Sequence, residues 1–333
     1  MKQQAFNRLL SRSEIHPVLI DVGSSGATPL VWEPIAAHSI FVGFDPDLRE
    51  IYETSEGHFH QSVTINEAIT DDKGREEIAL HLTKFPYCSS TLEPDFESLS
   101  GFLFADFFEV ERTERVRATT LDAVLERLSL ARIDWLKLDT QGTDLRIFRS
   151  LQDEVRSRVL AVDIEPGLID AYLGEDLFAD AHKSLTGEGF WLSNLNVGGA
   201  VRMSAGTLAE VTASHPDITR EFVEAHLKKS PGWCEARYLR SLDALRESAL
   251  TSREYLLLWV FALLDGQLGY ALEVALEYER AFQSDEVSRS MKDETIALVR
   301  HERRKTRRPE LNMASVKAIV PARTKRWIKK LIK

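Results

Sequence analysis

The sequence predicts an α/β fold: a mostly parallel, doubly wound sheet of about seven strands with helices on both faces, followed by an all-α domain. Two observations carry this prediction. Short apolar, β-branched runs alternate with helix-like stretches through the first 200 residues, which is the pattern of a parallel sheet covered on both sides. From residue 207 to about residue 300 no convincing two-residue period appears, and the composition favours helices.

Five runs are predicted as core strands because each is short and apolar, like a strand buried on both faces. They are residues 17–23, 39–45, 62–66, 133–139 and 159–165. Lys73-Gly74 is predicted as a hairpin turn before an antiparallel insertion at 77–83, and 110–120 as a further strand. Segments 190–194 and 199–203 are predicted to close the sheet as a hairpin, so the strand count approaches seven.

The remaining elements divide the chain into domains 1–205, 206–300 and 301–333, the last being a basic tail. In the first domain, helices are predicted at 121–128, where Thr120 is the cap, and at 144–151. In the second, residues 256–264 are apolar nearly all round, which predicts a helix buried in this domain or in a subunit interface. Residues 233–240 interleave aromatic and arginine side chains, which indicates a helix-helix core or a surface for acceptor recognition or dimerisation.

Charge is distributed unevenly along the chain. The formal net charge of −10 on 333 residues argues against a general affinity for nucleic acid or anionic lipid. However, residues 300–333 hold 13 Lys and Arg against 2 acidic residues, net +11, which leaves 29 basic and 50 acidic residues before them, net −21. The sequence therefore predicts an acidic body with a basic tail.

The cysteines and the N-terminal segment indicate the compartment. Cys88 and Cys234 have no spacing typical of a disulfide framework or a zinc site, which favours a reducing environment. The first 20 residues lack an apolar signal segment, and the longest apolar run, 255–264, is too short to span a bilayer. We predict a cytoplasmic protein whose basic tail also binds peripherally to the inner face of the membrane.

A glycine-bearing loop, DVGSSG at 21–26, follows the first predicted strand. Such a loop lets the backbone approach a ligand, and the next helix offers free N–H groups. It lacks the G-x-G-x-x-G pattern of dinucleotide sites, which favours a ligand without phosphates. Asp45 ends the second strand, where a carboxylate typically accepts hydrogen bonds from ribose hydroxyls. Together these features indicate a nucleoside; the alternative is that the glycines shape a tight turn and Asp45 caps the next segment.

These motifs resemble the FkbM family of S-adenosylmethionine-dependent methyltransferases. The resemblance rests on residues 21–26, 43–45, 120–122 and on IDWLKLDTQG at 133–142 followed by Asp144, in the family's order and over about residues 15–200. Ser24-Ser25, Thr140-Gln141 and Asp144 depart from the family's usual residues. The departure at Gln141 replaces a charged family residue with a neutral one.

The resemblance implies a class I methyltransferase (Rossmann-like) fold of seven strands with the last antiparallel, and O-methylation of a hydroxyl on a sugar, polysaccharide or related natural product. It also implies that S-adenosylmethionine is the cofactor. The resemblance implies that eight residues contact the cofactor. They are Asp21, Gly23, Ser24 and Gly26 of the first loop, Asp45 after the second strand, and Asn66, Glu67 and Ala68 after the third. An acidic neighbourhood is compatible with a cationic sulfonium.

Alcohols are poor nucleophiles, so methyl transfer needs a base or a Lewis acid near the acceptor oxygen. Asp139 and Glu165 end the fourth and fifth predicted strands, at the carboxyl edge where ligands bind in open α/β sheets. We predict Asp139 as the acceptor-side carboxylate. Two alternatives are that the pair holds a divalent cation, and that Glu165, before Pro166, caps a helix.

Two further side chains are weaker candidates. His182 lies in a helix predicted after the fifth strand and would supply an imidazole base, although an exposed helix residue explains it more simply. Ser90 follows the inserted hairpin and would line the site, although a solvated turn explains it equally well.

The partners predicted from these features are a carbohydrate or glycan acceptor, an anionic membrane surface and a second copy of the chain, but no nucleic acid, because no reading module accompanies the basic tail. The function alternative to methyl transfer is a catalytically idle methyltransferase-like module that binds a partner through its helical domain and tail. The departure at Gln141 motivates this alternative.

The tail leads to a first prediction. Each basic residue near an anionic leaflet is worth about 1 kcal/mol, and Trp327, Ile328 and Leu331 would enter the interface. In liposome co-sedimentation at low salt, we expect the full chain to pellet with anionic vesicles more than a chain ending at Glu302. Equal pelleting of the two proteins contradicts a membrane role and favours a solvated tail.

Overall fold

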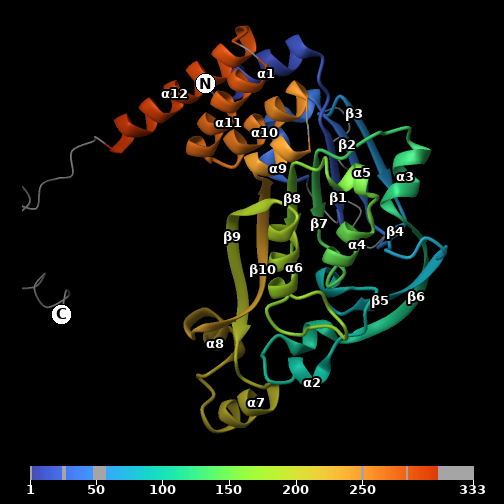
Figure 1. The fold of residues 1–333 in the computed structure, drawn as a ribbon. Coiled ribbons are helices and arrows are strands. Elements are labelled where there is room, and N and C mark those ends of the chain that lie inside the picture. The colour runs from blue at the N-terminus through green and yellow to red at the C-terminus, as the bar shows by residue number, and fades with distance from the viewer. Residues whose placement is uncertain (1, 25–27, 48–57, 249–250, 283, 307–333) are drawn as a thin grey trace, which may run out of the picture.

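The computed structural model describes residues 2–24, 28–47, 58–248, 251–282 and 284–306. Its centre is a seven-stranded sheet in the order β3-β2-β1-β7-β8-β10-β9 (Figure 1). The strands are β1 (Val18–Val22), β2 (Ile40–Phe44), β3 (Gln61–Ile65), β7 (Trp135–Leu138), β8 (Ala161–Ile164), β9 (Phe190–Val201) and β10 (Lys229–Arg240). Neighbouring strands from β3 to β8 are parallel, whereas β10 is antiparallel to both of its neighbours. The predicted seven-stranded, mostly parallel sheet is confirmed.

Helices cover both faces because apolar side chains point alternately to the two sides of each strand. In β1, Leu19 joins the core on one face and Ile20 the core on the other. The first face is covered by α1 (Lys2–Ser13), η1 (Leu30–His38), α9 (Leu242–Glu247), α10 (Ser252–Leu264), α11 (Leu268–Phe282) and α12 (Glu286–Thr306). The second face is covered by α3 (Leu121–Arg127), α4 (Asp144–Ser150) and α6 (Phe178–Gly187).

A second, three-stranded sheet has the order β4-β6-β5. Its strands are β4 (Ala68–Ile69), β5 (Glu77–Thr83) and β6 (Val110–Thr119). The predicted turn at Lys73-Gly74 joins β4 and β5, but both strands pair with β6 rather than with each other. The connection from β5 to β6 contains η3 (Pro86–Cys88), α2 (Phe96–Leu99) and η4 (Ala105–Phe108). This inserted segment reaches the carboxyl edge of the main sheet.

The predicted boundary at residue 205 is wrong, because β10 lies within the supposed helical domain of 206–300 and forms part of the main sheet. Pro231 and Gly232, poor strand formers, obscured an alternation in which Cys234, Ala236 and Tyr238 are buried. The predicted hairpin at 190–203 is wrong too. That segment is one long strand, β9, which pairs with β10 along its whole length.

The C-terminal helices pack on the sheet rather than forming a core of their own. The predicted burial of 256–264 is largely confirmed, since every residue of α10 from Leu256 to Leu263 is buried, in the same cluster as Trp135 and Leu239 of the sheet. Two short helices, α7 (Ala205–Ser214) and α8 (Arg220–His226), fill the link between β9 and β10, and α5 (Asp153–Arg156) precedes β8.

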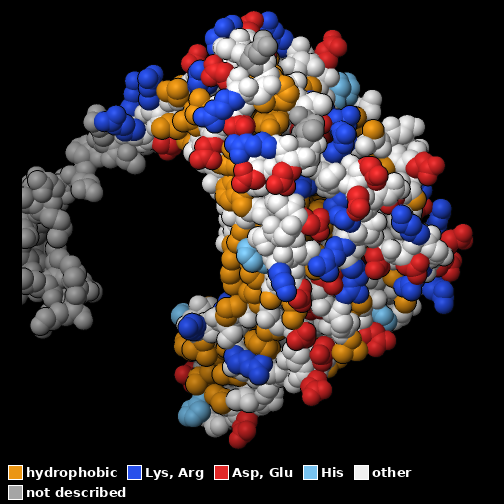
Figure 2. Space-filling model, in the orientation of Figure 1, with side chains coloured by type: hydrophobic (Ala, Val, Ile, Leu, Met, Phe, Trp, Pro, Cys, Tyr) orange, Lys and Arg blue, Asp and Glu red, His pale blue; other side chains and the backbone are white. Residues whose placement is uncertain are grey.

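Hydrophobic side chains are exposed along β9 and α8, on the concave side of the molecule (Figure 2). They include Leu195, Val197 and Phe222. Helix α12 carries the first residues of the basic tail, whereas 307–333 lie outside the described residues. Within the described ranges, no helix has both the length and the apolar character that a membrane crossing requires.

A buried ion pair joins the sheet to α10. Both carboxylate oxygens of Asp134, just before β7, lie 2.7 Å from the Arg253 guanidinium, and Oδ2 also accepts the Val18 backbone N–H at 2.8 Å. Asp134 is 1% exposed. We expect Asp134→Asn to lower the free energy of unfolding in urea by about 3 kcal/mol, because it removes the nearer charge partner of Arg253 and leaves only Glu254, at 3.7 Å. Exposed Asp153→Asn is the control, and equal losses in the two variants would contradict this role.

Candidate active site

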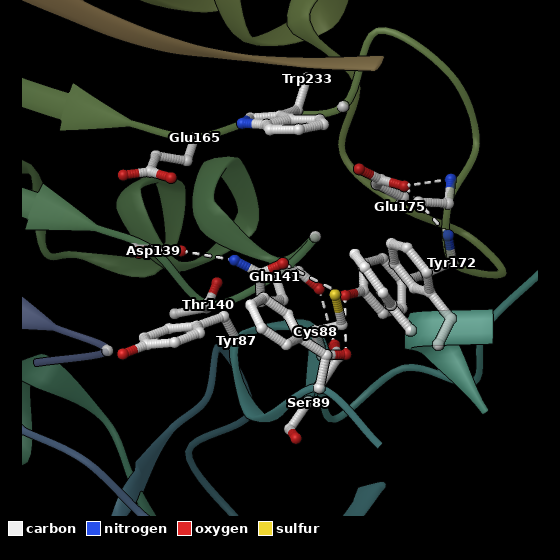
Figure 3. Close-up of a pocket in the computed structure, with 18 of the residues that line it drawn as sticks. Tyr87, Cys88, Ser89, Asp139, Thr140, Gln141, Glu165, Tyr172, Glu175 and Trp233 are labelled. Carbon is white, nitrogen blue, oxygen red and sulfur yellow. Dashed lines mark hydrogen bonds between the residues drawn. The ribbon is translucent and has the colours of Figure 1, made fainter. Parts of the chain in front are cut away.

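A cavity of about 500 Å³ opens at the carboxyl edge of the parallel strands (Figure 3). Its floor comes from residues that follow β1, β2, β7 and β8, where ligands bind in open α/β sheets. The inserted segment between β5 and β6, the ends of β9 and β10, and the loop after β8 close its sides. The site is therefore assembled from segments that lie far apart in the sequence, between residues 22 and 233.

Of the residues implied for the cofactor, Gly23, Asp45, Glu67 and Ala68 line this cavity. Three others, Asp21, Ser24 and Asn66, do not line it, and Gly26 lies outside the described residues. The contact of these three residues with the cofactor stays a prediction.

Gly23 lies against the backbone that follows β7. A Cβ at this position would lie 2.0 Å from the carbonyl oxygen of Asp139, and the backbone has φ +85°. Only glycine fits both conditions. The side chain of Asp21, two residues earlier, is buried and accepts a hydrogen bond from the Lys137 ammonium at 3.1 Å. The first loop is thus shaped by its contact with the strand that carries Asp139.

Asp45 stands at the end of β2 with Oδ1 accepting the backbone N–H of Asp47 at 2.8 Å. The Asn66 side chain donates to the Asp45 carbonyl at 2.6 Å, so it ties the ends of β2 and β3 together. Glu67 lines the cavity and is paired with Arg117 and Arg127, each at 3.1 Å. Asp45 therefore follows the second strand as predicted and lines the cavity, and its contact with Asp47 fits the alternative role of a cap.

Asp139 and Glu165 both line the cavity, as their places after β7 and β8 predict. Between them lies the buried carboxylate of Asp144. Its Oδ1 accepts the backbone N–H and the hydroxyl of Thr140, at 2.9 and 2.5 Å, and its Oδ2 accepts the Glu165 N–H at 2.8 Å. Asp144 thereby fixes the backbone beside both candidate carboxylates.

The ionisable side chains around Asp139 change one another's pKa values. Burial, reinforced by the Asp139 carboxylate, raises the pKa of Glu165 to about 9. Burial alone would lower the pKa of Lys137, but the carboxylates of Asp21 and Asp139 outweigh it and raise that pKa. Lys137 lies 3.7 Å from Asp139. At neutral pH Lys137 is therefore a cation, whereas Glu165 is protonated and able to donate a hydrogen bond.

Gln141 occupies the centre of the cavity wall (Figure 3). Its amide donates to Asp139 Oδ1 at 2.7 Å, and its Oε1 lies 3.2 Å from the Tyr172 hydroxyl. Its backbone has φ 55°, an uncommon value for a residue with a side chain, and its carbonyl accepts the Ser90 hydroxyl at 2.6 Å. A neutral amide suits this position because it donates to Asp139, which an ionised glutamate could not do.

Glu175 closes the end of the cavity opposite Glu165 in Figure 3. Its Oε2 accepts the backbone N–H groups of Ala171 and Tyr172 at 2.7 and 3.0 Å, and burial raises its pKa to about 7. A Cβ on Gly167 would lie 2.1 Å from Glu175 Oε1. The loop after β8 is thus folded around this carboxyl group.

His182 is not part of the site. It lies on α6, on the second face of the sheet, where its ring stacks on Phe178 and its Nδ1 lies 3.1 Å from the Tyr238 hydroxyl. It does not line the cavity, and its prediction as an imidazole base is wrong because α6 packs along the strands rather than at their carboxyl edge. Ser90 does line the cavity, but its hydroxyl is engaged with the Gln141 backbone.

Sequence reasoning missed four residues of this site: Lys137, Tyr172, Glu175 and Trp233. Lys137 had a signal, since it is a lone charge inside an otherwise apolar strand. Trp233 was singled out but assigned to the supposed helical domain. Tyr172 and Glu175 lie in a loop with no local pattern, and only the folded chain brings them to Gln141.

The lining is acidic. Among the described residues that line the cavity, seven are acidic and one, Lys229, is basic. The acidic residues are Asp45, Asp47, Glu67, Asp139, Glu165, Glu175 and Glu224. No group of three or more His, Cys, Asp and Glu in the described part of the chain has the arrangement of a metal site. The divalent cation stays a prediction.

A mostly parallel sheet with a cavity at its carboxyl edge and a carboxylate after the second strand is the arrangement in which doubly wound α/β proteins bind ligands. Residues 36–191 match the sequence model of the methyltransferase FkbM domain. The predicted resemblance is confirmed over that range, which begins after the first loop. A search of curated proteins gives no match.

Glu165 provides a test of the site's electrostatics. Because its pKa of about 9 in the folded protein lies above its usual 4.5, the stability it contributes is complete below about pH 4.5 and is lost as the pH rises toward 9, by about 1.4 kcal/mol per pH unit. Glutamine does not ionise. We therefore expect Glu165→Gln to be more stable than the wild type by urea unfolding, with a larger difference at pH 8 than at pH 5.

Exposed Glu210→Gln is the matched control, and its difference from the wild type should be the same at both pH values. A Glu165→Gln difference that does not grow with pH would show that the carboxyl group is ionised in the folded protein.

Proposed function

We propose that this protein is an S-adenosylmethionine-dependent O-methyltransferase that acts on a hydroxyl of a sugar, polysaccharide or related natural product. The observation that carries the proposal is the position of Asp139. Asp139 directly follows β7 within the residues that match the FkbM methyltransferase domain, and it lines the cavity. Its carboxylate accepts a hydrogen bond from the Gln141 amide at 2.7 Å. The strand order and the antiparallel β10 support a class I fold.

The residues present fit the proposed cofactor. Gly23 presents backbone without a side chain to the cavity at the end of β1, Asp45 offers a carboxylate for ribose hydroxyls, and Ala68 also lines the cavity. The acidic lining favours a cation. When bound, S-adenosylmethionine would supply an electrophilic methyl group.

The chain's own residues would orient and deprotonate the acceptor. Asp139 would accept the proton of the acceptor hydroxyl, a step typically worth about 100-fold to 10,000-fold in rate. Gln141 restricts the Asp139 carboxylate to one orientation, and Tyr172 in turn restricts Gln141. The protonated Glu165 would donate a hydrogen bond to a neighbouring oxygen of the acceptor.

Asp139→Asn tests the proposal. We expect transfer of labelled methyl groups from S-adenosylmethionine to a panel of methyl glycosides and polysaccharides to fall by about 100-fold or more, because the amide cannot take the proton. Calorimetric titration with S-adenosylhomocysteine should give an affinity within about threefold of the wild type, because the cofactor end of the cavity is unchanged.

Exposed Asp153→Asn is the control for a charge change elsewhere. A folded wild type that does not bind S-adenosylhomocysteine removes the cofactor assignment. Undiminished transfer by Asp139→Asn removes the base assignment, and cofactor binding without transfer to any acceptor favours the idle binding module.

A further inference from the structure

The indole of Trp233 forms one wall of the cavity, although it is 38% exposed. In the view of Figure 3, Trp233 and Tyr87 lie on opposite sides of the Asp139–Gln141 pair. All four residues line the same cavity. A large aromatic face that is open to solvent beside a candidate catalytic carboxylate is a ready surface for a ring-shaped ligand.

The backbone of β10 directs Trp233 into this position. The pairing of β10 with β9 shifts between Pro231, which is opposite Gly199, and Trp233, which is opposite Gly198. Gly232 is the extra residue of this bulge, and a bulge changes the direction in which the next side chain points. The indole then lies over Gly198, where a Cβ would be 2.3 Å from the ring. Two independent features of the backbone therefore hold the ring at the cavity.

The surroundings of the indole limit the ligand's chemistry. Phe104 extends the aromatic surface, with its ring centroid 6.1 Å from that of Trp233. Glu165 and Glu175 lie to either side of Trp233 in Figure 3, with Asp139 and Gln141 across the cavity. An apolar face combined with carboxyl and amide groups around it matches a sugar ring, whose C–H face is apolar and whose rim carries hydroxyls.

The charge of the lining selects among sugars. Glu165 is protonated, and Glu67 and Glu224 are paired with arginines. Even so, the acidic residues Asp45, Asp47, Asp139 and Glu175 outnumber Lys229 in the described lining, so a carboxylate or phosphate on the bound ring would be repelled. We propose that Trp233 is the platform on which a neutral sugar ring of the acceptor stacks, with its hydroxyl rim toward Asp139 and Glu165. This inference rests on the proposed function and specifies its substrate class.

The test measures binding separately from transfer. With the full chain saturated with S-adenosylhomocysteine, methyl glycosides of neutral hexoses are titrated and followed by saturation-transfer NMR. We expect Trp233→Ala to weaken glycoside binding by about tenfold or more, and Trp233→Phe by about threefold, because a smaller ring retains part of the stacking surface. The affinity for S-adenosylhomocysteine should stay within about threefold in both variants.

Gly198→Ala is the most specific variant. It leaves Trp233 in the chain, and the added methyl group displaces the indole ring. We expect about fivefold weaker glycoside binding with unchanged cofactor affinity. Phe222→Ala is the matched control, since Phe222 is 45% exposed and lies on α8 outside the cavity lining; glycoside binding should not change.

The outcomes separate the two proposals. Loss of S-adenosylhomocysteine binding in the wild type contradicts the proposed function. Retained cofactor binding with equal glycoside affinity in the wild type and Trp233→Ala overturns the platform, as does a wild type that binds none of the glycosides. Tighter binding of the matching uronic acid glycosides overturns the selection for a neutral ring, and binding of phenols alone would assign the platform to an aromatic acceptor.

Discussion

The carboxylate of Asp144 is the interaction on which the rest of the site depends. It is buried, and its two oxygens accept three hydrogen bonds from the segments that follow β7 and β8. A single group from α4 therefore sets the distance between two strand ends and the relative position of Asp139 and Glu165. Loss of such an acceptor would leave buried N–H groups unsatisfied, which costs about 1 to 3 kcal/mol for each. The site is rigid at the point where proton transfer is proposed.

This anchor brings three carboxyl groups close together, and the protein offsets the repulsion in two ways. Lys137 lies within β7 and pairs with Asp21 of β1 and with Asp139. Glu165 keeps its proton, because its raised pKa of about 9 reflects burial and the adjacent Asp139 charge. The result is one carboxylate oriented by an amide and one neutral carboxyl group, in the same cavity. Two residues of the same acid class thus acquire different roles from their surroundings.

The sequence was sufficient for the parallel part of the fold and for the residues at its strand ends. Apolar runs marked β1, β2, β3, β7 and β8, and the side chains directly after these strands, Asp45, Asp139 and Glu165, do line the cavity. The sequence was insufficient to predict which residues within the strands and loops line the cavity. Asp21 lies within β1 and is buried against Lys137, so it does not line the cavity although it is next to the glycine loop in the sequence.

The failure at β10 has a topological cause. In the parallel strands the carboxyl end reaches the ligand edge, so a search for polar residues at the end of each strand finds the site. Strand β10 runs in the opposite direction, and its beginning, Lys229 to Trp233, reaches that edge instead. Pro231 and Gly232 look like strand breakers in the sequence, yet they form the bulged start that turns Trp233 toward the cavity. The residues that hid this strand from prediction are the ones that make it part of the site.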